Sequence, residues 1–223
     1  LTASPLFASA VVGASAVLLG GSEALKQSLL PDIAGGKMTL ALALEETHHH
    51  NPTYISTTAK IQGENFILSG SKCFVLDGHS ADKLIVVART GGTERSSAGL
   101  TLLLVDRNTS GVSCRRTFIA DSRNAANIRF DDVVVPAENA LSTVNQGWAI
   151  LEPVLDRGRV ALAAEMMGCA LEAFERTVAY LKEREQFGRP IGTYQAISHP
   201  LATTMMELEL GRSPSIAELA VEV

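Results

Sequence analysis

A change of hydrophobic period, which occurs twice along the chain, is the feature that most constrains its fold. Between about Lys37 and Leu141 short apolar segments alternate with turn-forming residues, whereas the sequence on either side has the pattern of helices. Clusters such as Ser69-Gly70-Ser71 separate these segments at the ~8 to 12 residue spacing that is typical of an antiparallel sandwich or barrel. The expected strands are Tyr54 to Ile61, Phe66 to Leu68, Lys72 to Leu76, Lys83 to Ala88, Gly99 to Val105, Val112 to Phe118, Ala126 to Phe130 and Val133 to Val135. We therefore expect an α+β, multi-domain fold in which helical segments flank one antiparallel β domain, a sandwich or a barrel.

The flanking segments carry recognisable helix signals. Leu6 to Leu30 predicts one or two helices, broken at Gly20-Gly21-Ser22, with Ser22 as the N-cap of the second. After Gly147 a segment rich in Ala, Leu, Met, Glu and Arg predicts a long helix that runs to about Arg184. A turn built on Gly188, Pro190 and Gly192 follows, and a second helix is expected over Gln195 to Leu210. The three zones are residues 1–36, 37–141 and 142–223.

Charge and apolar content exclude several classes of function. The chain has 24 acidic and 19 basic residues and a net charge of −5, so we expect no basic surface for nucleic acid. The apolar run from Ala8 to Gly21 is shorter than the ~20 residues of a membrane span, so no membrane segment is expected. Cys73, Cys114 and Cys169 are an odd number at wide spacing, which indicates neither a disulfide framework nor a metal site and favours the reducing cytoplasm.

Four passages of the sequence resemble the acyl-CoA dehydrogenase family of flavoenzymes. They are FDDVVVPAENAL from Phe130 to Leu141 with Gly147-Trp148 after it, REQFGRPI from Arg184 to Ile191 with Gln195-Ala196 after it, LALEE from Leu42 to Glu46, and FVLDG from Phe74 to Gly78. The resemblance implies a β-barrel middle domain (37–141) between the end of an N-terminal helical domain (1–36) and part of a C-terminal helical domain (142–223). The chain would then be truncated at both ends. It also implies FAD as cofactor and an acyl-CoA thioester as substrate, dehydrogenated between its α and β carbons.

One group of cofactor residues is implied at the turn between the two long helices. Arg184 presents a fork of donors that matches pyrophosphate oxygens, and in relatives this arginine reaches the FAD of a neighbouring subunit. The positions of the resemblance add Gln186, Phe187, Tyr194 and Gln195 to that contact. The alternative is that these residues have no role in binding. Arg184 would then form a surface ion pair with a flanking glutamate, and Phe187 would be an ordinary core residue.

A second group of cofactor residues is implied in the middle domain: Leu44 and Glu45 in one stretch, and Phe74, Val75 and Leu76 in the other. Phe74 takes the place of the aromatic residue that stacks beside the flavin in relatives. Its alternative is a strand residue that faces the barrel interior. Leu76 stands where relatives often have a threonine that hydrogen-bonds to the flavin; an apolar side chain cannot do so, which leaves a backbone contact.

Substrate contacts are implied at Asn51 in the loop after the first stretch, and at Asp156 and Arg159, which lie three residues apart on one helix face. The alternative for the helical pair is a salt bridge on the surface. The loop departs from the family, because His48 to His50 replace a glycine-rich stretch and cannot turn as glycines do. A metal site is an alternative interpretation of these histidines. The sequence does not favour it, because adjacent side chains diverge and no second group of ligands has the usual spacing.

The sequence does not identify a catalytic base. Some relatives carry the catalytic glutamate where this chain has Gly158, and Glu152 qualifies only if burial raises its pKa. Leu76, the loop of His48 to His50 and Gly158 favour one alternative, a non-catalytic subunit of a heteromeric acyl-CoA dehydrogenase. An acyl-CoA oxidase or flavin hydroxylase on the same fold is another alternative, which differs in how the reduced flavin reacts with oxygen. The partners that the resemblance implies are the acyl-CoA substrate, an electron-transfer flavoprotein or similar acceptor, and further copies of the chain in a homodimer or homotetramer.

Overall fold

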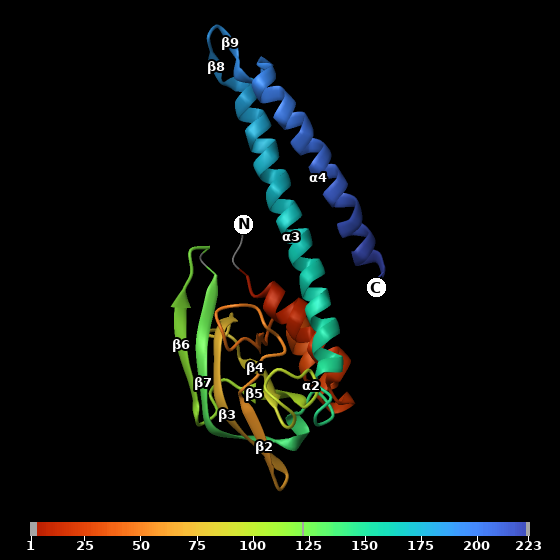
Figure 1. The fold of residues 1–223 in the computed structure, drawn as a ribbon. Helices are drawn as coiled ribbons and strands as arrows, with labels where there is room; N and C mark the ends of the chain where they lie inside the picture. Colours follow the sequence, from red (N-terminus) through yellow and green to blue (C-terminus); the bar gives the residue numbers. More distant parts are fainter. Residues whose placement is uncertain (1–3, 122, 222–223) are drawn as a thin grey trace. The chain divides into compact units, whose positions relative to one another are not determined.

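The computed structural model describes residues 4–121 and 123–221, with side chains as far as residue 212. The residue contacts divide the chain into two compact units, Leu1–Arg157 and Gly158–Val223. The first unit holds a curled β-sheet and the N-terminal helices, and the second is helical apart from a small hairpin (Figure 1). No helix among the described residues is long and apolar enough to cross a membrane.

Three helices open the first unit. A π-helix, η1, covers Leu6–Gly13, α1 covers Ala14–Gly20, and α2 covers Glu23–Ala34. The predicted break at Gly20-Gly21-Ser22 is confirmed, because α1 ends at Gly20 and α2 begins after Ser22. The Ser22 hydroxyl accepts a hydrogen bond of 3.3 Å from the Leu25 backbone N–H, so the predicted N-cap is confirmed as well.

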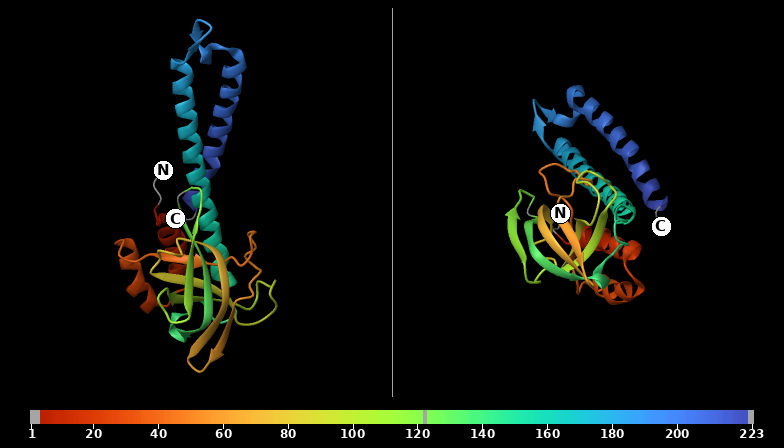
Figure 2. Two further views of the ribbon diagram at one scale, coloured as in Figure 1. Left: turned by 90° about the vertical axis from the view of Figure 1, so that its left-hand side faces the viewer. Right: turned by 60° about the horizontal axis from the view of Figure 1, so that its bottom comes forward.

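The sheet has seven strands and curls into a half-barrel, which confirms the predicted fold of a β domain flanked by helices (Figure 2). The strands are β1 Leu40–Ala43, β2 Thr58–Gln62, β3 Asn65–Leu76, β4 Lys83–Arg89, β5 Leu100–Asp106, β6 Val112–Phe118 and β7 Asn124–Pro136. Their order is β1-β4-β2-β3-β7-β6, with β5 on β4. Pairing is antiparallel except that β4 runs parallel to β1 and meets β2 in a parallel bridge, so the sheet is mixed.

The strands differ from their predicted bounds where long-range pairing overrides local turn signals. The predicted turn at Ser69-Gly70-Ser71 is wrong, because β3 continues through it with Gly70 at φ 146 and only a shift of register. A Cβ at Gly70 would lie 2.6 Å from the Thr57 hydroxyl oxygen, so glycine admits the close approach of the chain here. The two last predicted strands likewise form one strand, β7, and β1 was not predicted as a strand.

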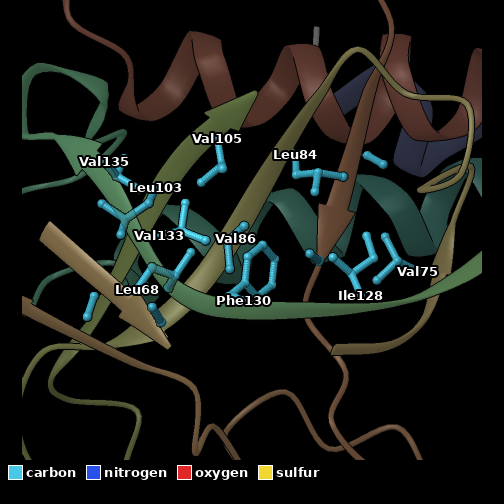
Figure 3. Packing of buried hydrophobic residues seen from close by; sticks show 14 of the residues in the cluster. Leu68, Val75, Leu84, Val86, Leu103, Val105, Ile128, Phe130, Val133 and Val135 are labelled. Carbon is cyan, nitrogen blue, oxygen red and sulfur yellow. The ribbon is translucent and has the colours of Figure 1, made fainter. Parts of the chain in front are cut away.

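The core of this unit has two parts, because β4 is buried on both faces. Leu84 and Val86 point into the hollow of the sheet, where they meet Leu68, Ile128 and Phe130 (Figure 3). On the opposite face the odd-numbered residues of β4 pack against the helices, together with apolar side chains of β5, α1 and the first turns of α3. Each fully buried Leu, Ile or Phe contributes roughly 1.5–3 kcal/mol, so these two clusters account for much of the stability.

Helix α3 covers Trp148–Glu183, after a 3₁₀ turn, η2, at Ala137–Asn139, and it confirms the predicted long helix. The second unit continues with a hairpin of β8 (Glu185–Gln186) and β9 (Arg189–Pro190), and with a 3₁₀ turn, η3, at Ile191–Thr193. This is the predicted turn. Helix α4 covers Gln195–Val221, so the predicted second helix continues well beyond Leu210.

Candidate functional site

In the first unit, the segment that follows β1 lies alongside the second half of β3. The Cys73 N–H donates to the Glu45 carbonyl at 2.7 Å, and the Cys73 thiol donates to the Thr47 carbonyl at 3.0 Å. The Lys72 ammonium donates to the Leu44 carbonyl at 3.0 Å. The two stretches singled out as cofactor residues of the middle domain are therefore neighbours in the fold.

A buried ion pair fixes this arrangement. The Lys72 Nζ lies 2.7 Å from Glu46 Oε1, and the two side chains are 0% and 4% exposed. The other oxygen of Glu46 accepts a hydrogen bond from the Ser56 N–H at 2.7 Å, and Oε1 accepts one from the Thr57 N–H at 3.0 Å. Glu46 thus connects β3 to the far end of the loop, where the chain enters β2.

Burial and pairing act in opposite directions on this ion pair. Burial alone would raise the pKa of Glu46, but the charge of Lys72 and the hydrogen bonds from Lys72, Ser56 and Thr57 outweigh it and lower the pKa to about 2. Burial lowers the pKa of Lys72 from 10.5 to about 8, against the opposing effect of the Glu46 carboxylate. Both groups are charged at neutral pH, so the pair is a fixed dipole beneath the surface of the candidate site.

Phe74 stands on a β-bulge with its ring in solvent. The pairing of β3 with β7 shifts between Lys72 and Val75, and Phe74 has φ 52, a conformation that costs about 1–3 kcal/mol for a bulky residue. The residue is 52% exposed. The alternative that Phe74 faces the barrel interior is therefore wrong; that place belongs to Val75, which points into the core (Figure 3).

The second half of β3 leaves one edge without a strand. Of the described strands, β2 pairs with β3 only from Asn65 to Ser69, and β7 lies on the other edge. Besides the Phe74 ring, only backbone groups of this stretch can offer hydrogen bonds to a ligand, because the side chain of Val75 is buried and that of Leu76 is apolar. Leu44 is also buried in the core, so its contribution to a site would come from its backbone as well.

The histidine loop is held by Glu45. The His50 Nδ1 lies 2.6 Å from Glu45 Oε1, and the Asn51 N–H donates to Glu45 Oε2 at 3.1 Å. His48, His49 and Asn51 are exposed. Across the described residues no three His, Cys, Asp or Glu side chains are grouped so that they could hold a metal ion. The Glu45 carboxylate therefore orders this loop, and Asn51 is available at its surface.

Helix α3 carries the remaining candidates for substrate contact. Asp156 and Arg159 are exposed, and their spacing places them on one face of the helix. Gly158 between them is buried. Glu152 is exposed, so it lacks the burial that a catalytic base at this position would need.

In the second unit, the hairpin presents Arg184 and Phe187 to solvent. Phe187 is 93% exposed at φ 54, so the alternative that it belongs to the core is wrong. Arg184 is exposed, and within the described part of the chain it forms no ion pair with its neighbouring glutamates. Tyr194 ties the hairpin together: its hydroxyl donates to the Gln186 carbonyl at 2.9 Å, and the Arg189 guanidinium lies 4.1 Å from its ring centre. Gln195 is exposed at the first position of α4.

Sequence reasoning missed the residues that shape the site without facing a ligand, chiefly Lys72, Glu46 and Asn127. The sequence pattern could have identified Lys72, because it lies an even number of residues from Phe66 and Leu68 on β3 and so faces the core as they do. A buried lysine needs a carboxylate partner. No local signal marks Asn127, because its partner, the Phe74 N–H, lies on another strand.

Comparison with known proteins agrees with these features. The family model described as "Acyl-CoA dehydrogenase, middle domain" matches residues 41–133, and "Acyl-CoA dehydrogenase, C-terminal domain" matches residues 145–216. The chain is 33% identical over 211 residues to a probable acyl-CoA dehydrogenase of Bacillus subtilis. This alignment covers 92% of this chain and 56% of that protein. The chain thus spans about half the length of the curated relatives it matches.

Solved structures agree with the sequence matches. The butyryl-CoA dehydrogenase of Megasphaera elsdenii superimposes with a TM-score of 0.90 at 30% identity, covering 96% of this chain and 57% of that one. A glutaryl-CoA dehydrogenase of Mycobacterium smegmatis in complex with FADH2 superimposes with a TM-score of 0.85 at 26% identity, covering 93% and 53%. Two domain models of one family, a curated relative and solved structures all agree: the chain belongs to the acyl-CoA dehydrogenase family.

Proposed function

We propose that this protein is an FAD-dependent oxidoreductase that dehydrogenates an acyl-CoA thioester between its α and β carbons. The observation that carries the proposal is the exposed ring of Phe74, projected from a bulge at an open sheet edge beside the Glu45 segment, in a chain of this family. We keep the division into residues 1–36, 37–141 and 142–223 as the proposed arrangement of domains.

The residues present fit a flavin nucleotide. Phe74 offers an aromatic face, and the unpaired edge of Phe74 to Leu76 offers backbone donors and acceptors to a planar ring system. Glu45 contributes through its backbone, since its carboxylate already holds the loop. In the second unit the guanidinium of Arg184 fits a diphosphate, with Gln186, Phe187, Tyr194 and Gln195 beside it.

When bound, FAD would be the group that accepts the β hydrogen of the substrate as a hydride. The chain's own residues orient the substrate: Asn51 and Asp156 are proposed to contact the CoA portion, and Arg159 to contact the substrate near the wall of the active site. The buried charges of Lys72 and Glu46 keep the underlying loop fixed while a ligand binds. The α proton must be removed by a base, which we do not assign to a residue of this chain.

We further propose that copies of the chain associate and that an electron-transfer flavoprotein or similar acceptor reoxidises the flavin. The support for association is apolar surface on the second unit, where Met166, Met205, Met206 and Leu210 are all more than half exposed. A cytoplasmic location is proposed because the three cysteines are free thiols.

Purification of the full-length gene product in the presence of FAD tests the function. We expect flavin absorbance at one FAD per chain, and bleaching when one member of a series of acyl-CoA thioesters is added without oxygen. Arg184→Ala should weaken FAD binding, whereas the matched change Arg176→Ala, on the exposed surface of α3, should not. A protein that takes up no FAD, and shows no spectral change with any chain length, would contradict the proposal.

A non-catalytic subunit is the second candidate, favoured by Gly158, by the apolar Leu76 and by the exposure of Glu152. Such a subunit would lend Arg184 to the flavin of a homologous partner. Turnover by the homomer would exclude this candidate, and activity that appears only with a homologous subunit would favour it. Oxygen uptake during turnover would instead identify an acyl-CoA oxidase.

A further inference from the structure

The bulge beneath Phe74 places two residues of β3 opposite one residue of β7. Lys72 pairs with Ile128 and Val75 pairs with Ala126, so Cys73 and Phe74 both face the single residue Asn127. Such a bulge disrupts the ladder locally and leaves an extra residue outside the regular pairing. Here the N–H groups of both residues find acceptors other than the backbone of β7.

Both acceptors are present, and they come from opposite directions. The Cys73 N–H donates to the Glu45 carbonyl at 2.7 Å, on the edge of β3 that faces the loop. The Phe74 N–H donates to the side-chain Oδ1 of Asn127 at 3.0 Å, on the edge that faces β7. The Asn127 side chain thus supplies the hydrogen bond that the backbone ladder has lost at the bulge.

This bond acts on the residue whose conformation most needs support. Phe74 has φ 52, a region that a phenylalanine leaves readily unless its neighbours hold it. Asn127 also lines a cavity of about 400 Å³ together with Glu46, Lys72 and Cys73, so it lies beside the candidate site. A residue without a side-chain acceptor at this position would leave the Phe74 N–H without its partner.

We propose that Asn127 is a positioning residue: through its hydrogen bond to the Phe74 N–H it holds the aromatic ring at the open sheet edge, in the orientation that receives the flavin. This inference rests on the proposed function, because it assigns the ring of Phe74 to FAD. It adds a residue that touches neither cofactor nor substrate.

The experiment compares Asn127→Ala, which removes the acceptor, with Asn127→Asp, which keeps a side-chain oxygen at the same place. Asn108→Ala, on an exposed turn, is the matched control. Two properties are measured on the full-length gene product: hydrogen exchange at the Phe74 amide without added flavin, and the dissociation constant and visible circular dichroism of bound FAD. Asn127→Ala should speed the exchange and weaken FAD binding, each about five- to tenfold, and change the dichroism of the flavin. Asn127→Asp should restore both properties.

A double variant separates positioning from general support of the fold. In a Phe74→Leu background, Asn127→Ala should cause no further loss of FAD affinity, because the ring through which it acts is gone. An equal loss in both backgrounds, or unchanged FAD affinity and dichroism in Asn127→Ala, would overturn the inference. A wild-type protein that binds no FAD would overturn the proposed function as well. That outcome differs from failure of the inference alone, because in that case neither the wild type nor any variant gives a flavin signal.

Discussion

At the scale of single residues, Lys72 and Glu46 form a buried ion pair, which is costly to desolvate. Both side chains are buried and have lost their hydration. The ion pair and a few hydrogen bonds to neighbouring groups replace it. Removing one partner leaves the other buried without its counter-charge, whereas removing both leaves an apolar or neutral site. Such a pair specifies how the loop lies on β3 more than it adds to stability.

A double-mutant cycle tests this coupling. Glu46→Gln should lower the free energy of unfolding by roughly 3–5 kcal/mol, because Lys72 stays buried without its counter-charge. Lys72→Met should cost less, since Glu46 keeps its bonds to Ser56 and Thr57. The double variant should be more stable than the sum of the two losses predicts. Urea unfolding measures all three, with Lys60→Met on the exposed face of β2 as control; simple additivity would contradict a coupled pair.

The same pair makes stability depend on acid pH. The folded pKa of Glu46, about 2, lies below its ordinary 4.5, so the unfolded chain binds the proton more readily. The stability that this carboxylate contributes is therefore complete above about pH 4.5 and is lost as the pH falls toward 2. Thermal unfolding of wild type and Glu46→Gln should show their difference shrinking across that window; a constant difference would show that Glu46 titrates normally.

At the scale of elements, Arg89 joins two loops to the end of β4. Its guanidinium donates to the carbonyls of Ile55, Gly91, Ala98, Glu94 and Ser96 at 2.8–3.2 Å. The Ile55 N–H in turn donates to the Glu94 carbonyl at 2.9 Å, so the segment before β2 and the loop after β4 support each other. This connection decides where the chain re-enters the sheet after the histidine loop.

Arg89→Met should therefore loosen both loops together. We expect a loss of about 2–3 kcal/mol in unfolding free energy, because one buried and several part-buried carbonyls lose their donor. Hydrogen exchange at the Ile55 amide should also accelerate by at least about tenfold, since its bond to Glu94 depends on the ordered loop. Arg95→Met, exposed in the same loop, is the control; protection of Ile55 that survives Arg89→Met would refute this role.

The elements also show what a local pattern can and cannot predict. Ser22 as an N-cap was predictable, because a cap depends on residues within one turn. Gly70 was misread as a turn, because its positive φ serves the close approach of Thr57, which comes from elsewhere in the sequence. The parallel partner of β1, β4, is separated from it by two other strands in sequence, and no periodicity records such a pairing.

At the scale of the whole molecule, the first unit should fold without the second. Both described core clusters draw their residues from Phe7 to Leu155, all within Leu1–Arg157. A protein that ends at Arg157 should keep its β-sheet circular dichroism and unfold in one cooperative transition. The isolated segment 158–223 should lose helix or associate on dilution from denaturant, because single helices of such length are marginal in water. A first unit that unfolds without a cooperative transition would contradict this division.

The sequence by itself determined the succession of a helical, a β and a second helical zone, because periodicity, capping and turn chemistry act over a few residues. It also indicated which stretches flank the candidate site. The tertiary structure decided that Phe74 projects outward, that Lys72 meets Glu46, and that Asn127 completes the bulge. Each of these depends on groups that are distant in sequence, and their meeting is set by strand register and burial, which no local pattern encodes.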